Sequence, residues 1–218
     1  KQGVVVQNVL HRDAVKGGVH KLFYNWIWCG ILDATTGRPR RERKMITKHI
    51  VVEPFDEHWR LDFLKIQNEL TDALGQLAIS IEHVGSTSVQ GLSAKPIIDI
   101  MPVVESLDAV DAVASEFEKI GYVYMGEYGI TGRRYLYKGA NEHTHHIHIF
   151  SKNDTENITR HLAFRDYLNK HDDVKEAYAN LKKELAKKYP NDICLVEVNP
   201  EIQEKRRVTW RDYELIEA

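Results

Sequence analysis

The chain has 218 residues, of which 43% are hydrophobic and 28% charged, and its formal net charge is −2 at pH 7. This composition is typical of a soluble globular protein with one good core, and no hydrophobic run approaches the roughly 18 residues of a membrane span. We therefore expect a cytoplasmic protein without a membrane partner. The two cysteines, Cys29 and Cys194, lie far apart without metal-ligand spacing, so we expect reduced thiols rather than a disulfide framework.

Charge is distributed unevenly along the chain. Residues 1–44 carry nine Lys and Arg against three Asp and Glu, a net of +6, which leaves 21 basic and 29 acidic residues, a net of −8, in the remainder. Nucleic-acid binding requires clustered Lys and Arg to neutralise phosphates, so this acidic body argues against nucleic acid as an obligatory partner. A nucleotide or another phosphorylated small molecule needs only a local basic pocket and remains a candidate ligand.

The sequence divides into two parts. We interpret residues 1–44 as an N-terminal extension or fusion remnant and residues 45–218 as the folded domain. After Pro54 a helix is predicted, because hydrophobic residues recur at helical spacing: Trp59, Phe63, Ile66, Leu70, Ala73 and Leu77. Residues 79–84 alternate between apolar and polar as a half-buried strand does, and the nearly continuous apolar run 97–101 predicts a second strand.

One helix and three strands are predicted next. Ser106 can cap a helix that ends before Gly121, and strands are predicted at residues 122–125, 133–138 and 144–150.

The remaining segments complete the predicted architecture. The glycine-rich stretch 128–132 is expected to be mobile and to close over a ligand. Helices are expected from Asp154 or Thr155 to about residue 190, interrupted at His171, and residues 196–218 are expected to form an extra strand and a charged helix. Together the elements predict an α+β fold, with a mixed β-sheet and flanking helices.

A loop rich in small polar residues joins the first two predicted strands. Gly85 permits close backbone approach, and Ser86, Thr87 and Ser88 place three hydroxyls beside backbone N–H groups that could face an anion. Lys95 can add a positive charge. We therefore predict a phosphate-binding or nucleotide-binding loop.

Asp99 is the residue that most needs an explanation, because it stands alone in an apolar run. Burying a carboxylate without a partner costs several kcal/mol. We therefore expect a cation near Asp99, which is either a metal ion or a basic side chain.

The glycine-containing loop and Asp99 together resemble the motifs of a known protein superfamily. Gly85-Ser86 followed by Asp99 resembles the signature of the nucleotidyltransferase superfamily. The longer run from His83 to Ile100, His-Val-Gly-Ser-Thr-Ser-Val-Gln-Gly-Leu-Ser-Ala-Lys-Pro-Ile-Ile-Asp-Ile, resembles the GrpB-like branch of that superfamily more closely, as do residues 145–148 and 164–168. The resemblance spans roughly residues 45 to 193 and implies a nucleotidyltransferase-like fold.

The resemblance also implies a reaction. Nucleotidyl transfer uses divalent cations held by two or three carboxylates. Asp99 stands at the first carboxylate position, but Met101 stands at the second, and Glu82 could compensate only if its side chain faces the same site. His146 and His148 share one strand face, so we predict that they join Asp99 as catalytic residues and metal ligands. Mg²⁺ or Mn²⁺ is the expected metal, with Zn²⁺ as an option because imidazole suits Zn²⁺ and Mn²⁺ better than Mg²⁺.

Basic residues supply further candidates for phosphate binding. Arg133 and Arg134 are both candidates, although adjacent residues of a strand point to opposite faces and only one can readily face the site. Arg165 and Lys182 could each reach a bound phosphate, or could instead form surface ion pairs along a charged helix.

Three functional hypotheses follow. The first is a metal-dependent nucleotidyltransferase that acts on an unknown acceptor. The second is a catalytically degenerate relative that binds a nucleotide or phosphorylated metabolite without turnover, which the missing second carboxylate favours. In the third, the loop is only a structural turn and the histidines are a solvated strand edge.

Overall fold

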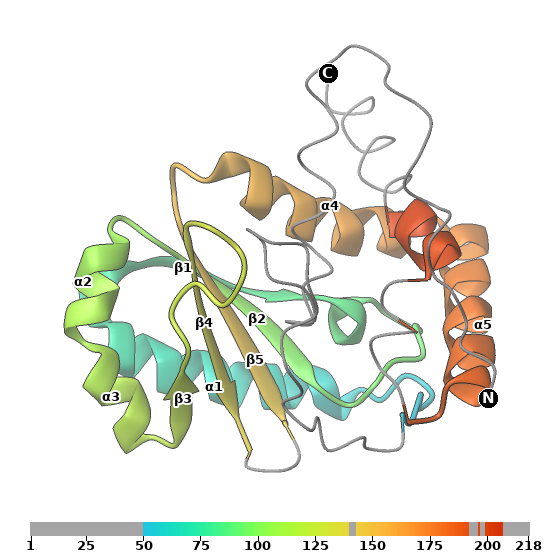
Figure 1. The fold of residues 1–218 in the computed structure, drawn as a ribbon, viewed down its shortest axis with the longest axis horizontal. Coiled ribbons are helices and arrows are strands. Elements are labelled where there is room, and N and C mark those ends of the chain that lie inside the picture. The colour runs from blue at the N-terminus through green and yellow to red at the C-terminus, as the bar shows by residue number, and fades with distance from the viewer. Residues whose placement is uncertain (1–49, 140–142, 192–195, 197–198, 207–218) are drawn as a thin grey trace, which may run out of the picture.

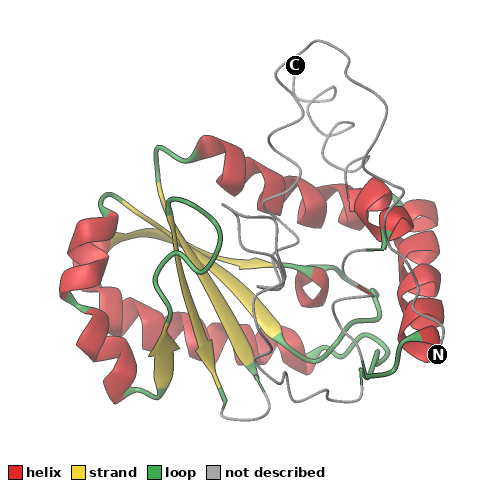
Figure 2. Cartoon of the chain, viewed as in Figure 1, coloured by secondary structure: helices red, strands yellow, loops and turns green. Residues whose placement is uncertain are grey.

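In the computed structural model, the described residues are 50–139, 143–191, 196 and 199–206. They form one five-stranded mixed β-sheet with helices on both of its faces (Figures 1 and 2). This confirms the predicted α+β class with a mixed sheet and flanking helices. The predicted extension, residues 1–44, lies outside the described residues.

The sheet contains one parallel pair of strands at its centre. Its strands are β1 (Ala78–Val84), β2 (Ile98–Val104), β3 (Tyr122–Tyr124), β4 (Arg133–Lys138) and β5 (His145–Ser151), and their spatial order is β1-β2-β5-β4-β3. β2 and β5 pair in parallel, whereas the other neighbours are antiparallel. The five strands predicted between residues 79 and 150 are all present. The bounds 133–138 match the prediction, and those of the other four strands differ from it by one to three residues at one or both ends.

Helices precede, separate and follow the strands. They are α1 (His58–Leu74), α2 (Leu107–Ala112), α3 (Ala114–Lys119), α4 (Thr155–Lys170) and α5 (Asp172–Lys188). The side chain of Ser106 accepts a hydrogen bond from the Ala109 amide, and Asp154 caps α4 in the same way through Asn157. His171 interrupts the helical hairpin as expected, since its backbone (φ −128°, ψ 88°) is not helical.

One sequence expectation about helices was wrong, and the expectation of a strand and a charged helix in 196–218 can be compared only with the described residues. The predicted single helix after Ser106 is divided at Val113, whose backbone (φ −106°, ψ 15°) leaves the α-helical region. Within the described part of 196–218, residues 200–206 are helical and no strand is present. The side chain of Asn199 explains this helical start, because its oxygen accepts from the amide of Glu201 at 2.9 Å.

Alternation along β2 divides its side chains between two cores. Ile98, Ile100 and Val104 join the main core with α1, α2 and α3, whereas Met101 and Val103 join a smaller cluster on the other face. The smaller cluster is covered by Ile158 and Leu162 of α4. In Figure 1, α1 passes behind the strands while the loop between β3 and β4 arches in front of them. Asp99 shares its face with Met101, so it lies opposite α1.

A third core positions α5 beside the loop that joins β1 and β2. Val89 and Leu92 of this loop are fully buried against α4 and α5, where their neighbours include Phe164, Leu168 and Tyr178. The loop is therefore fixed to the helical hairpin as well as to the sheet.

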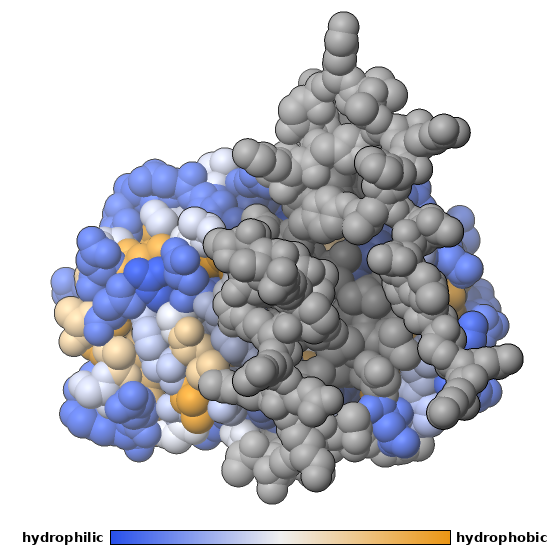
Figure 3. All heavy atoms as spheres, viewed as in Figure 1, coloured by the Kyte–Doolittle hydropathy of each residue, from blue (hydrophilic) through white to orange (hydrophobic). Residues whose placement is uncertain are grey.

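The described surface of the face in Figure 3 is mostly hydrophilic, with small hydrophobic patches. Among the described residues, we find no helix with both the length and the apolar character needed to cross a membrane.

Candidate functional site

The site begins with a contact between Gly85 and Asp99. Gly85 has φ +71° and ψ −168°, a conformation that is essentially restricted to glycine. A Cβ atom at this position would lie only 2.4 Å from Asp99 Oδ2. Glycine is therefore required here for two reasons, and it allows the carboxylate to lie directly against the loop backbone.

Two histidines of β5 face the other oxygen of Asp99. The parallel pairing places Asp99 beside His146. His146 Nδ1 lies 3.3 Å and His148 Nε2 lies 3.7 Å from Asp99 Oδ1. The side chains of Asp99, His146 and His148 are 31%, 24% and 16% exposed, so a solute can reach them. We call these three residues the Asp99 cluster.

The ionisation of Asp99 is set by opposing effects. Burial is the largest single influence and by itself raises the pKa of the carboxyl group, but the hydrogen bonding and charge of His146 and His148 together outweigh it. The pKa of Asp99 is therefore held well below its ordinary value, and Asp99 is a carboxylate at neutral pH.

Arg133 fixes the protonation of His148. Its NH1 lies 3.3 Å from His148 Nδ1, and because a guanidinium group can only donate, Nδ1 must accept. The proton of the neutral ring is then on Nε2, which faces Asp99. Burial, followed by the charge of Arg133, lowers the pKa of His148 to about 4, although Asp99 acts in the opposite direction. His148 is therefore neutral at pH 7. Its Nδ1 accepts from Arg133, and its Nε2–H faces Asp99 Oδ1 from 3.7 Å, which is longer than a hydrogen bond.

His146 connects the Asp99 cluster to His143. Its Nδ1 faces Asp99, which can only accept, while its Nε2 lies 3.1 Å from His143 Nδ1. His143 stacks on Tyr137 with ring centroids 4.2 Å apart. His143 precedes β5, whose first residue is His145. The ring of His145 lies instead near Tyr122, on the opposite face of the sheet.

The three hydroxyls of the predicted phosphate loop have different surroundings. The hydroxyl of Ser86 accepts from Lys182 Nζ of α5 at 3.0 Å. The hydroxyl of Ser88 donates to the carbonyl of Gly85 at 2.6 Å. Thr87 is buried, and its hydroxyl contacts His83 Nε2 at 3.1 Å. Thr87 therefore maintains the turn, whereas Ser86 is the hydroxyl that a basic side chain approaches.

The remaining predicted phosphate-binding residues are separated from one another. Arg133 faces the Asp99 cluster, but Arg134 points to the opposite face, where its guanidinium forms an ion pair with Asp111 at 2.6 Å. This is a correction to the prediction for Arg134, and its cause is strand alternation. Lys95 is exposed on the segment that precedes β2.

The second carboxylate position holds an apolar residue, Met101, and the side chains around it are apolar too. Met101 is fully buried in the cluster with Val84 and Phe150. Glu82 pairs with Met101 across β1 and β2, so it shares that face, but its carboxylate accepts from Arg165 at 3.1 Å. Glu82 is therefore held by an ion pair within the protein.

The donor set does not fit a resident Mg²⁺ ion. Mg²⁺ requires an octahedral shell of oxygen ligands, whereas the Asp99 cluster offers one carboxylate and two imidazoles, and Nδ1 of His148 already accepts from Arg133. In the described part of the chain, we find no group of three or more His, Cys, Asp or Glu side chains arranged to hold a metal ion.

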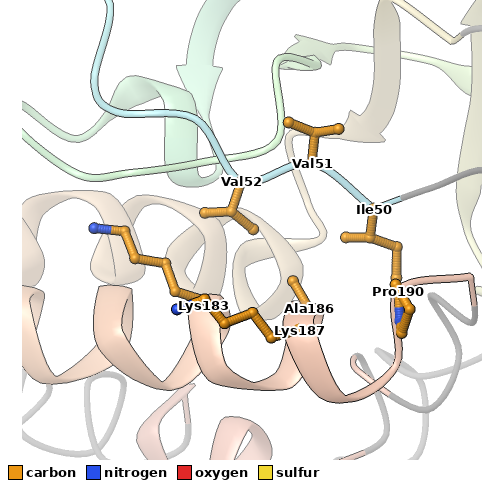
Figure 4. A pocket seen from close by; sticks show the side chains of 7 residues that line it. All are labelled: Ile50, Val51, Val52, Lys183, Ala186, Lys187 and Pro190. Atoms are coloured by element: carbon orange, nitrogen blue, oxygen red, sulfur yellow. The ribbon is translucent and has the colours of Figure 1, made fainter.

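A cavity of about 490 Å³ lies elsewhere, between α5 and the segment 50–52 (Figure 4). Lys183 and Lys187 contribute to its lining, and the other lining residues are apolar. It shares no lining residue with the Asp99 cluster or the Gly85 loop.

Sequence reasoning missed the aromatic side of the site. Tyr135 of β4 lies against both histidines, with ring centroids 5.7 Å from His146 and 5.5 Å from His148, and Tyr128 stacks on Tyr135 at 5.1 Å. The alternation Arg133, Tyr135, Tyr137 along one strand face was the signal that could have identified this wall.

Comparison with known proteins agrees with the sequence motifs. UPF0157 protein YqkA of Bacillus subtilis is 42% identical over 139 residues, which are 64% of this chain but only 40% of that protein. The crystal structure of conserved protein GrpB from Enterococcus faecalis matches with a TM-score of 0.72 and 40% identity, over 75% of this chain and 99% of that one. A weaker likeness extends to the Cid1 poly(U) polymerase, with a TM-score of 0.45 and 16% identity over 62% of this chain and 44% of that one. The family model described as "GrpB protein" matches residues 49–199, and the chain therefore belongs to the GrpB family.

Proposed function

We propose that this protein binds a phosphorylated small molecule, and specifically a nucleotide, with the phosphates at the Gly85 loop. The observation that carries the proposal is the 3.0 Å approach of Lys182 to the hydroxyl of Ser86, next to the glycine that lies against Asp99. A lysine and a hydroxyl on a glycine-containing loop are groups that commonly bind phosphate. The resemblance of Gly85-Ser86 and Asp99 to the nucleotidyltransferase signature supports a nucleotide as the ligand.

Binding without turnover is favoured over transfer by the second carboxylate position. Met101 is fully buried among apolar side chains, and Glu82 is held by Arg165. The paired carboxylates that would bridge a divalent ion and a triphosphate are thus missing from β2.

Metal-dependent nucleotidyl transfer is the second candidate. One observation favours it: nitrogens of His146 and His148 converge on a single oxygen of Asp99, at 3.3 and 3.7 Å. Zn²⁺ or Mn²⁺ would suit these ligands better than Mg²⁺ and would act as a Lewis acid on a phosphate.

A thermal-shift panel of nucleoside triphosphates in chelator tests the binding proposal. A nucleotide present at a hundred times its dissociation constant should add about 2.7 kcal/mol to the free energy of unfolding, which is roughly 5 to 10 °C for a protein of this size. Lys182→Met should weaken binding roughly 10- to 150-fold, because it removes a charged hydrogen-bond donor. Lys183→Met is the matched control, since the neighbouring lysine lines the separate cavity and should leave the shift unchanged.

The same panel, run both in chelator and with divalent ions and combined with a pyrophosphate assay, separates the two candidates. Binding alone predicts a shift that persists in chelator, whereas transfer predicts a shift and pyrophosphate release that both require a divalent ion and are lost in Asp99→Asn. Equal shifts for the Lys182→Met and wild-type proteins would contradict the proposed position of the phosphates.

A further inference from the structure

Tyr128 has an unusual backbone conformation for a bulky residue. It is the only non-glycine residue with positive φ in the described ranges, at +43°. One face of its ring stacks on Tyr135, yet the residue remains 48% exposed, so burial alone does not account for a tyrosine at this position. A left-handed conformation costs a non-glycine residue about 1 to 2 kcal/mol, and such strain persists only where the surrounding structure enforces it.

Hydrogen bonds from a buried arginine hold Tyr128 in this conformation. Arg133 is 7% exposed, and its guanidinium donates to the carbonyl oxygens of Tyr128 at 2.7 Å and Glu127 at 3.3 Å. The carboxylate of Glu127 accepts from the amide of Gly132 at 2.8 Å, and Ile130 is buried in the small apolar cluster. The loop between β3 and β4 is therefore anchored at several points, which argues against the mobile, closing loop expected from its glycines, and these contacts position the Tyr128 ring.

The Tyr128 ring extends the aromatic wall of the site toward solvent. It stacks on Tyr135 with an interplanar angle of 11°, and Tyr135 is only 8% exposed. Tyr135 in turn lies beside His146 and His148, which face Asp99. Asp99 thus lies between the Gly85 loop and an aromatic wall that ends in an exposed ring.

We propose that Tyr128 is a stacking platform for the aromatic base of the nucleotide. This inference rests on the proposed function and adds a subsite to it: phosphates bind at the Gly85 loop, and the base stacks on the exposed ring of Tyr128. The site then selects nucleoside phosphates over inorganic polyphosphates and sugar phosphates. Stacking accounts for the strained, half-exposed tyrosine, which the fold alone does not explain.

Calorimetric titrations with tripolyphosphate and with ATP, GTP, CTP and UTP test the platform. At least one nucleotide should bind the wild-type protein about 5- to 150-fold more tightly than tripolyphosphate, the range expected for one base on one aromatic ring. Tyr128→Leu should abolish this preference without changing the affinity for tripolyphosphate, and Tyr128→Phe should retain it. Tyr128→Gly is a second test without the ring, because glycine adopts positive φ without strain and so keeps the loop conformation.

The outcomes distinguish this inference from the proposal on which it rests. If tripolyphosphate binds but no nucleotide binds more tightly, or if Tyr128→Leu and Tyr128→Gly keep the nucleotide preference, the platform is wrong and the phosphate site stands. If neither tripolyphosphate nor any nucleotide binds, both are wrong.

Discussion

Substitution of Gly85 by alanine tests the contact on which the site is built. The added Cβ would lie 2.4 Å from Asp99 Oδ2, 2.9 Å from Asp99 Cβ and 3.0 Å from Asp99 Cγ. Two of these atoms are close to the backbone, so rotation of the carboxylate alone cannot relieve the clash. Either the loop or β2 must move, and the tripolyphosphate affinity should fall with that movement.

The expected loss of stability has two parts. The backbone conformation of Gly85 costs a residue with a side chain about 1 to 3 kcal/mol, and forcing an extra methyl group into a packed site costs about 1 to 3 kcal/mol more. Gly85→Ala should therefore lower the free energy of unfolding by about 2 to 6 kcal/mol. Urea denaturation followed by tryptophan fluorescence measures this loss by linear extrapolation.

Gly126→Ala provides the matched control. Gly126 also has a positive φ, +61°, but nothing lies within 4 Å of its added Cβ. Only the conformational cost applies, about 1 to 2 kcal/mol. If Gly85→Ala is no more destabilising than Gly126→Ala, and tripolyphosphate affinity is unchanged, the close approach of Asp99 to the loop is refuted.

Three further predictions concern stability. His83 stacks on Phe63, and burial is the main effect that lowers its pKa to about 4, below the value near 6.5 in the unfolded chain, so its neutral form contributes stability that is lost as pH falls from 6.5 toward 4. Between pH 7 and pH 5, His83 should account for about 1 to 2 kcal/mol of the stability loss measured by urea denaturation, so this loss should be smaller by that amount in His83→Gln. Thr87→Val should lower the free energy of unfolding by about 1 to 3 kcal/mol in the same assay, because it removes the hydroxyl group that His83 Nε2 contacts and leaves that nitrogen without this partner. Met101→Asp should cost about 3 kcal/mol or more, because it buries a carboxylate in an apolar cluster.

Each of these predictions has a result that would contradict it. An unchanged pH dependence in His83→Gln would show that another group accounts for the acid sensitivity. A Thr87→Val protein as stable as the wild type would mean that the hydroxyl faces solvent. A fully stable Met101→Asp protein would show that this position can accept a carboxylate after all.

Alternation was the most informative pattern in the sequence. It indicated that His146 and His148 share a face and that Arg133 and Arg134 do not. The structure places these side chains accordingly. These relations are local, because each follows from the pleat of a single strand.

The parts that could not be predicted depend on contacts between distant segments. Parallel pairing of β2 with β5 brings Asp99 to His146 across 46 intervening residues, and no local pattern specifies that register. The packing of the loop against α5 turns Thr87 inward and brings Lys182 to Ser86. The hydrophobic periodicity after Ser106 continues through the break at Val113, so it gave no sign of two helices.

The most direct test of the central claim is a ¹H–¹⁵N NMR titration of the protein with tripolyphosphate in chelator. Binding at the Gly85 loop predicts that the largest saturable shift changes occur at the amides of Gly85, Ser86 and Thr87, and that Lys182→Met greatly reduces them. Changes centred on Lys183 and Lys187 beside the separate cavity, or no saturable change at all, would contradict the claim that this loop binds phosphate.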